Sequence, residues 1–249
     1  MYIESFYFND LENVDDGFIN MDVGRVQYYK DLHLRYHIDF SVNNKKKIYS
    51  YEFLSGLLFD VVKNKNFLSD IAWVLFPRHG YNWDGGHVSQ ELYLKNKYCL
   101  KSNLLDIRDC GSLCVYQAIS LAKSLNKNVL IVSIEMDSIF KNFPYIGFLE
   151  IRKNRTSSKN FYIDYCNFFY TKNKNSLKNF VNLMLKNFEI SLEDVFIVSH
   201  KNFGFCFDSA FLYKALSVID EKNKDRKYLL IVDQEMSLQR YAVVLLRKG

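Results

Sequence analysis

The feature that most constrains the fold is an internal repeat, visible first in two short apolar segments with nearly the same ending. Residues 129–136 read VLIVSIEM, and residues 229–236 read LLIVDQEM. Short runs this rich in Val, Ile and Leu predict strands that are buried on both faces. Each follows a helical pattern of apolar residues, at 115–125 in one half of the chain and at 212–219 in the other. A helix followed by a buried strand therefore occurs twice.

The repeat extends in both directions along the chain. Three further kinds of segment match between the halves: an amphipathic helix, an acid followed by an apolar strand, and a last apolar strand. They lie at 51–62 and 177–188, at 68–76 and 192–200, and at 146–153 and 242–249. Matching order over five elements favours a duplication over the ordinary alternation of helices and strands in α/β proteins. Such alternation implies right-handed crossovers and largely parallel sheets, with one sheet in each half.

The halves differ in length at one place. The first half has a long excursion between residues 76 and 116, with a further helix pattern at 88–97, whereas the equivalent passage at 200–213 is short. We interpret residues 154–176, rich in Asn and Lys, as a diverged connection and residues 1–47 as a short irregular or strand-containing cap. The predicted organisation is one compact unit made of two halves, 1–153 and 154–249.

Composition excludes several classes of protein. With 49% hydrophobic residues the chain can bury a sizeable core. It has no apolar run of the roughly 18 residues that a membrane helix needs, and no signal-peptide pattern, so we expect a soluble, cytoplasmic protein. Five cysteines without a CxxC pair, and five histidines without an HExxH pattern, predict neither a disulfide framework nor a metal site. The net charge of +5 forms no basic stripe, which argues against nucleic-acid binding. It would suit an acidic protein partner, although a solvated surface explains it equally well.

Three segments beside the predicted strands are rich in side chains that could react or bind a ligand. Residues 106–118 read DIRDCGSLCVYQA, and residues 193–203 read EDVFIVSHKNF. Residues 78–87 read RHGYNWDGGH, a composition typical of a functional loop. We expect this loop to line a pocket or a subunit interface, and not to hold a metal. Its candidate residues are Arg78, His79, Trp83 and His87, and Asp109 is a further candidate for the same pocket or interface.

The order of these motifs within a duplicated unit resembles the thiolase-like proteins, in particular the β-ketoacyl-acyl-carrier-protein synthase III branch. The family motif D-x-x-x-x-C-S-G-x-x-Y-A-L is similar to residues 106–118, where Asp106, Ser112 and Tyr116 fall in register. His200 matches the histidine of the family's H-Q-A-N motif. The resemblance covers roughly residues 48–249. It implies two pseudo-symmetric mixed sheets with helices between and outside them, in the layer order α-β-α-β-α, and a dimeric protein that handles acyl thioesters.

The resemblance suggests a nucleophile and its partner. Cys110 lies just before a predicted helix, whose free N–H groups and positive dipole end favour a thiolate. His200 would approach from the other half, and backbone N–H groups near Gly111 and Ser112 could form an oxyanion hole. Asp109, however, would raise the pKa of a neighbouring thiol, which opposes activation. The alternative is that Cys110 is a small buried residue and His200 a core histidine.

Two departures from the family pattern bear on whether the protein is an active enzyme. The family's cysteine aligns with Gly111, one position after Cys110, and the family's active-site asparagine has no counterpart. These departures favour a catalytically degenerate subunit that pairs with an active ketosynthase. The alternative is an active acyltransferase or condensing enzyme that uses Cys110 and His200 with an acyl-coenzyme A or acyl-carrier-protein donor. Either hypothesis predicts a homodimer or heterodimer, a possible acyl carrier protein as partner, and no cofactor other than the thioester substrate.

Overall fold

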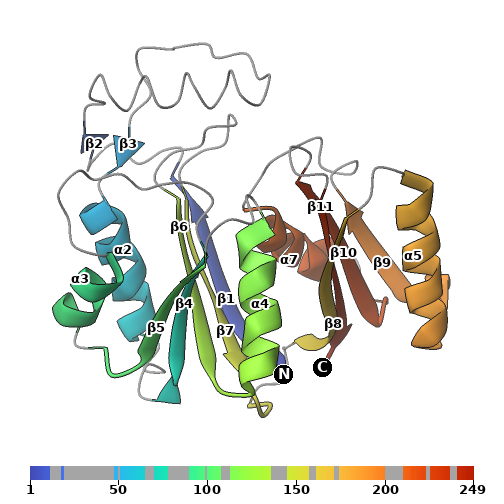
Figure 1. Cartoon of the computed structure of the whole chain (residues 1–249), viewed down its shortest axis with the longest axis horizontal. Coiled ribbons are helices and arrows are strands. Elements are labelled where there is room, and N and C mark those ends of the chain that lie inside the picture. The colour runs from blue at the N-terminus through green and yellow to red at the C-terminus, as the bar shows by residue number, and fades with distance from the viewer. Residues whose placement is uncertain are drawn as a thin grey trace.

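The computed structural model shows one nine-stranded β-sheet whose two parts lie on either side of a central pair of helices, with further helices outside (Figure 1). The residues it describes are 1–11, 18–19, 48–49, 51–64, 70–77, 90–98, 100–107, 113–135, 145–156, 161–170, 174–199, 210–222, 225–235 and 240–249. The Arg78–His87 loop and both candidate catalytic residues lie outside these ranges.

Among the described residues, the first half contributes five strands to the large sheet and has three helices. They are β1 (Tyr2–Asp10), α2 (Tyr51–Asn64), β4 (Trp73–Pro77), α3 (Gln90–Lys97), β5 (Asn103–Ile107), α4 (Cys114–Leu125), β6 (Val129–Glu135) and β7 (Tyr145–Arg152). Two short strands, β2 (Phe18–Ile19) and β3 (Ile48–Tyr49), pair with each other in a separate sheet.

The described residues of the second half form four strands, two α-helices and a 3₁₀ turn. They are β8 (Phe161–Tyr170), α5 (Lys174–Asn187), η3 (Leu192–Asp194), β9 (Val195–Ser199), α7 (Phe211–Lys222), β10 (Tyr228–Glu235) and β11 (Arg240–Lys248). None of the helices in the described part of the chain is long and apolar enough to span a membrane.

The strand order β5-β4-β6-β7-β1-β8-β11-β10-β9 reveals the duplication. The neighbours β5, β4 and β6 run parallel, as do β9 and β10, and all other neighbouring pairs are antiparallel. In the described strands, the sheet passes from one half to the other where Tyr2 pairs with Tyr162 and Ile3 with Phe161. From this junction outward, β1, β7, β6 and β4 repeat as β8, β11, β10 and β9. The predicted duplicated α/β fold with mixed sheets is therefore confirmed.

The structure refines the sequence interpretation at two places. Residues 1–47 were expected to be an irregular or strand-containing cap, and the strand β1 that they contain belongs to the repeat. Residues 154–176 were expected to be a diverged connection, but they contain β8, the strand equivalent to β1. The predicted alignment of 68–76 with 192–200 is also one residue out of register. Val74 pairs with Leu130, and Ile197 pairs with Leu230, which occupies the equivalent place in the repeat. Val74 and Ile197 are thus the true counterparts, and the division of the chain after residue 153 stays a prediction.

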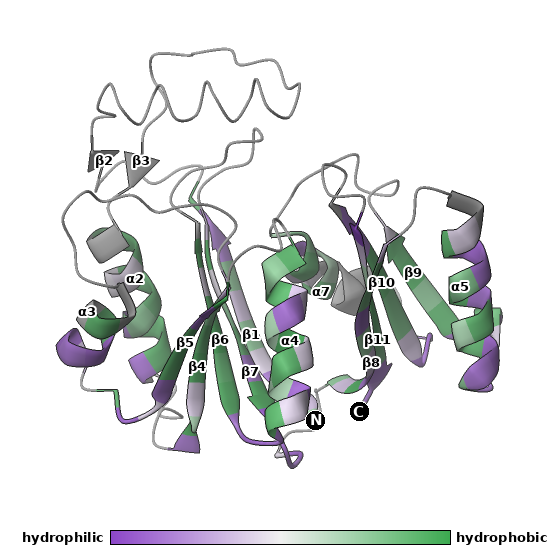
Figure 2. Cartoon of the chain, viewed as in Figure 1, coloured by the Kyte–Doolittle hydropathy of each residue, from purple (hydrophilic) through white to green (hydrophobic). Residues whose placement is uncertain are grey.

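The layers follow from strands that are apolar on both faces (Figure 2). On β6, Val129 and Ile131 join the central hydrophobic cluster, whereas Leu130 and Val132 face outward to a second cluster with α2. The second half has the same alternation on β10, whose outward residues pack under α5. The helices α4 and α7 lie in the central cluster. The layer order is therefore α-β-α-β-α, as the resemblance implied.

Candidate functional site

The carboxyl ends of the parallel strands lie at one edge of the molecule, away from the junction of the halves (the upper edge in Figure 1). Each sequence motif follows one of these ends. The loop at 78–87 follows β4, the segment with Cys110 follows β5, and His200 comes directly after the last residue of β9. In open α/β sheets, ligands bind at the carboxyl ends of the strands. The motifs are therefore anchored at the edge where a site is expected.

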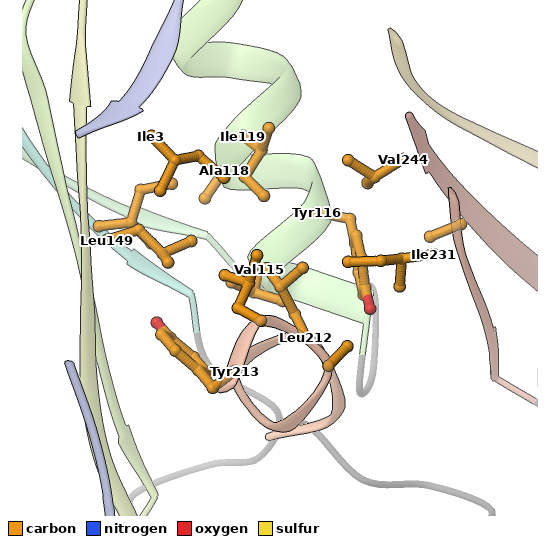
Figure 3. Packing of buried hydrophobic residues seen from close by; sticks show 14 of the residues in the cluster. Ile3, Val115, Tyr116, Ala118, Ile119, Leu149, Leu212, Tyr213, Ile231 and Val244 are labelled. Atoms are coloured by element: carbon orange, nitrogen blue, oxygen red, sulfur yellow. The ribbon is translucent and has the colours of Figure 1, made fainter. Parts of the chain in front are cut away.

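The first turns of α4 and α7 meet in the central layer, close to the same edge. Val115 and Tyr116 of α4 belong to one buried cluster with Phe211 and Leu212 of α7. Figure 3 shows Val115 and Leu212 next to each other between the two helices. Helix N-termini carry free N–H groups and a positive dipole end. The segments before α4 and α7, which hold Cys110 and His200, both lead into these termini.

The two central helices carry the same sequence pattern. Residues 114–120 of α4 read CVYQAIS, and residues 211–217 of α7 read FLYKALS, so that Tyr116 and Tyr213 occupy equivalent places. Each tyrosine reaches toward the sheet of the opposite half: Tyr213 toward the first, and Tyr116 toward Ile231 and Val244 of the second (Figure 3). Each central helix therefore packs one tyrosine ring against the sheet strands of the other half, and these contacts hold the halves together.

Tyr213 is held by a specific set of contacts in the first half. Its hydroxyl lies 2.7 Å from the Ser133 hydroxyl, which is itself buried. Its ring stacks on Phe8 at 5.9 Å between centroids. A Cβ added to Gly147 would come within 3.1 Å of the ring, so a larger residue at this position of β7 would press on the Tyr213 ring. Burial raises the pKa of the Tyr213 phenol, only partly offset by the Ser133 hydrogen bond, and keeps it protonated.

The second half places a carboxylate where the first half has a serine. The repeat aligns Ser133 with Asp233, and the register agrees, because Ser133 pairs with Gly147 and Asp233 with Ala242. Asp233 is 1% exposed, and its Oδ1 accepts a hydrogen bond from the Gln234 amide at 2.7 Å. Sequence reasoning missed this residue. The sequence did contain a signal. At this inward-facing position VLIVSIEM has a neutral serine, whereas LLIVDQEM has a charged aspartate.

The described residues include two cysteines, of which Cys114 is buried and Cys166 is half-buried. Cys114, the first residue of α4, is buried, as expected if it acts as a small apolar residue. Cys166 on β8 donates a hydrogen bond from its thiol to the Tyr116 carbonyl at 3.4 Å. Burial raises the pKa of the Cys166 thiol to about 12, and the charge of Lys123 opposes this rise. Neither side chain is suited to act as a nucleophile.

For the candidate residues predicted from the sequence, the structure gives only the strands and helices that flank them along the chain. All of them lie outside the described residues: Cys110, Gly111, Ser112, Asp109, His200, Arg78, His79, Trp83 and His87. Within the described part of the chain, no three His, Cys, Asp or Glu side chains gather in a way that could hold a metal ion. The expectation that the site has no metal stays a prediction.

Solved structures with a similar fold cover between 78% and 99% of the chain. ChlB3, described as an acyltransferase, has a TM-score of 0.62 at 8% identity, over 99% of this chain and 97% of its own. AbyA1, a tetronic acid condensing enzyme, has a TM-score of 0.57 at 8% identity, over 99% and 100%. A β-ketoacyl-acyl-carrier-protein synthase III from Thermus thermophilus has a TM-score of 0.51 at 14% identity, over 78% and 84%. No protein-family model and no curated protein sequence matches the chain. The chain has the thiolase-like fold, in the form that resembles β-ketoacyl-acyl-carrier-protein synthase III. The duplicated strand order, the two central helices and these similarities show it.

Proposed function

We propose that this protein is an acyltransferase that takes an acyl group from a thioester donor onto Cys110, with His200 as its proton-transfer partner. The proposal rests on the observation that the elements flanking these two residues come together in the structure. Cys110 lies between β5 and α4, and His200 lies between β9 and α7, whose first turns pack together in the central layer. Two reactive side chains from opposite halves would thus face one space at the carboxyl edge.

The chemistry needs no group beyond the donor and an acceptor. His200 takes the proton of the Cys110 thiol, and the sulfur attacks the thioester carbonyl. The bond between the acyl carbon and the donor sulfur then breaks, and the donor leaves as a thiol with the proton from His200. A hydroxyl or amine acceptor would attack the acyl-cysteine in the second step, giving an ester or amide and restoring the Cys110 thiol. Backbone N–H groups at the start of α4 would stabilise the negative charge on the carbonyl oxygen in both steps.

The choice of acyl transfer over condensation rests on the sequence. The family's active-site asparagine has no counterpart, which favours an oxygen or nitrogen acceptor over a decarboxylative condensation. The structural neighbours include proteins named for each reaction, the acyltransferase ChlB3 and the condensing enzyme AbyA1. Acyl-coenzyme A and acyl carrier protein both provide suitable thioesters, and we place the activity in the cytoplasm, where these donors occur.

A second candidate is a degenerate subunit that pairs with an active ketosynthase. The first half inserts α3 and β5 between β4 and α4, whereas only residues 200–210 separate β9 from α7 in the second half. This shortening, and the one-residue displacement of Cys110, favour a lost activity. A pairing surface would be available at β5, the last strand of the sheet, where Leu105 is 39% exposed. Either candidate would form a homodimer or heterodimer through this edge.

Intact-protein mass spectrometry after incubation with acyl-coenzyme A and acyl carrier protein thioesters tests the proposal. We expect a mass increase of one acyl group that is absent in Cys110→Ala. The matched control is Cys166→Ala, which removes a buried thiol with a raised pKa and should keep the adduct. If the chain stays unmodified while a bound ketosynthase becomes acylated, the degenerate-subunit candidate replaces the acyltransferase.

A further inference from the structure

We propose that Glu4 and Asp164 are a matched pair of β-bulge residues at which the nine-stranded sheet bends, and that this bend sets the angle between the two halves. The angle determines how far apart the carboxyl ends of β4 and β9 lie at the opposite edge of the molecule. The inference deepens the acyltransferase proposal and rests on it only for the catalytic consequence. The sequence motifs give neither acid a role.

The strands β1 and β8 change direction next to the junction of the halves. At the junction they are antiparallel, with Tyr2 paired to Tyr162 and Ile3 to Phe161. In a flat sheet, this pairing would send β1 and β8 to opposite edges of the molecule. Figure 1 instead marks both chain ends at the lower edge, where β1 begins and β11 ends. Because β11 is antiparallel to β8, both β1 and β8 run from the lower edge to the upper edge. Each strand therefore turns close to the junction.

A β-bulge lies directly after the junction on β1. Ile3 pairs with Ile151 of β7, and Ser5 pairs with Glu150, the residue next to it. Glu4 is therefore an extra residue on β1 that has no partner position on β7. An extra residue of this kind bends its strand and increases the local twist. The bulge thus lies where β1 has to turn.

The second half has a bulge at the equivalent place on β8. Ile163 pairs with Leu246 of β11 and Tyr165 with Leu245, so that Asp164 is the extra residue. Aligned by the junction, the two strands read Tyr-Ile-Glu at 2–4 and Tyr-Ile-Asp at 162–164. This likeness is too short to be recognised without the pairing. The same position and the same acidic chemistry in both halves favour a feature of the repeat over an accidental irregularity in one strand.

Each acidic side chain fixes its bulge by contacts outside its own strand. The Glu4 carboxylate accepts hydrogen bonds from the Thr156 amide, at 3.3 Å, and from the Thr156 hydroxyl. The Asp164 carboxylate lies 3.2 Å from the Arg247 guanidinium. A bulge residue is left out of the regular ladder, and Lys123 of α4 donates a hydrogen bond to the Asp164 carbonyl at 3.1 Å. The second bulge is therefore also tied to the central helix of the first half.

A bend at the lower edge controls the spacing at the upper edge. Since a strand of nine residues is about 30 Å long, a change of about 10° at the lower end of β1 moves its upper end by about 5 Å. Groups that exchange a proton must approach to within about 3 Å. Glu4 and Asp164 lie at the lower edge, so their role is to position the halves and not to take part in the chemistry.

Distances between spin labels, measured by double electron–electron resonance, test the bend. With the five native cysteines replaced by alanine, labels on Asp60→Cys of α2 and Lys186→Cys of α5 report the distance between the halves. Deletion of Glu4 or of Asp164 closes the gap in register and leaves the other strand pairs in place. We expect each deletion to shift the distance between the halves by about 3 Å or more, the rise of one strand residue. The matched control pair, Asp60→Cys with Lys127→Cys, lies within the first half and should keep its distance.

A substitution guards against misfolding of the deletion variants. Arg247 is 48% exposed, and Arg247→Met removes the ionic contact of Asp164 without shortening the chain. We expect it to broaden the distribution of distances between the halves, whereas the control Arg226→Met, also at an exposed position, should leave the distribution unchanged.

The native distance in a deletion variant that is folded by circular dichroism would overturn the inference. If neither deletion variant folds, an unchanged distribution in Arg247→Met would overturn it. The label distances require no catalytic activity, so they are independent of the acyl-adduct experiment. A missing adduct together with the expected shift in distance contradicts the acyltransferase and supports the bend.

Discussion

Tyr213→Ala is expected to lower the free energy of unfolding by about 3–5 kcal/mol, the range for removing a large aromatic side chain from a core. Tyr213 is fully buried and packs against Phe8, Tyr145 and Gly147. The substitution leaves a cavity between α7 and the first sheet, and it removes the hydrogen-bond partner of buried Ser133. Because α7 belongs to the second half, the loss weakens the contact between the halves. Chemical denaturation followed by circular dichroism measures the effect.

Tyr213→Phe separates the ring from the hydroxyl. It keeps the stacking on Phe8 and removes only the hydrogen bond to Ser133, so we expect a loss of about 1–3 kcal/mol. The difference between the two variants reports the contribution of the ring. If Tyr213→Ala proves no more destabilising than Tyr213→Phe, the exchanged tyrosine is not what holds α7 against the first sheet.

Arg152→Met is expected to cost about 3–5 kcal/mol of stability, because it leaves a buried carboxylate without its counter-charge. On β7, the Arg152 guanidinium lies 2.5 Å from the Glu150 carboxylate, and their side chains are 14% and 5% exposed. Ser5 of β1 donates a hydrogen bond to the other Glu150 oxygen at 2.7 Å. Burial by itself would lower the pKa of Arg152, but Glu150 and Asp70 raise it overall.

The double variant Glu150→Gln with Arg152→Met is the matched control. It removes both charges, so we expect it to be clearly more stable than Arg152→Met alone. Thermal and chemical denaturation of the single variants and the double variant completes the cycle. A single variant that is as stable as the double variant would mean that Glu150 is stabilised by Ser5 and solvent, and that the ion pair contributes little.

The fold could be predicted because the duplication leaves a strong pattern in its most buried elements. Strands β6 and β10 are apolar on both faces, and α4 and α7 share the pattern of a central tyrosine, alanine and serine. The strands β1 and β8, which meet in the middle of the strand order, could not be recognised. Their residues are mostly half-buried and mix aromatic with polar side chains, so neither strand has a clear period. Their place in the repeat is visible only from the pairing partners.

The motifs of the site could be predicted from the sequence, but the buried residues around it could not. The order of the segments with Cys110 and His200 was readable from the sequence, and the structure anchors both at the carboxyl edge. Asp233 was read as part of an apolar strand. Its burial on the inward face of β10 is visible only in the structure. The pairing of Ser133 with Tyr213, which are 80 residues apart, likewise depends on tertiary structure.

Cross-linking between the segments after β5 and β9 tests the central claim, that both lead into one site between the halves. In a background with Cys99→Ser and Cys206→Ser, a short bis-maleimide reagent is added to the His200→Cys variant. The account predicts an intramolecular link between Cys110 and the new thiol, identified by peptide mass spectrometry. The control Lys186→Cys, on the exposed face of α5, should give no such link. The account is contradicted if a monofunctional maleimide modifies both thiols of the His200→Cys variant but the bifunctional reagent never joins them.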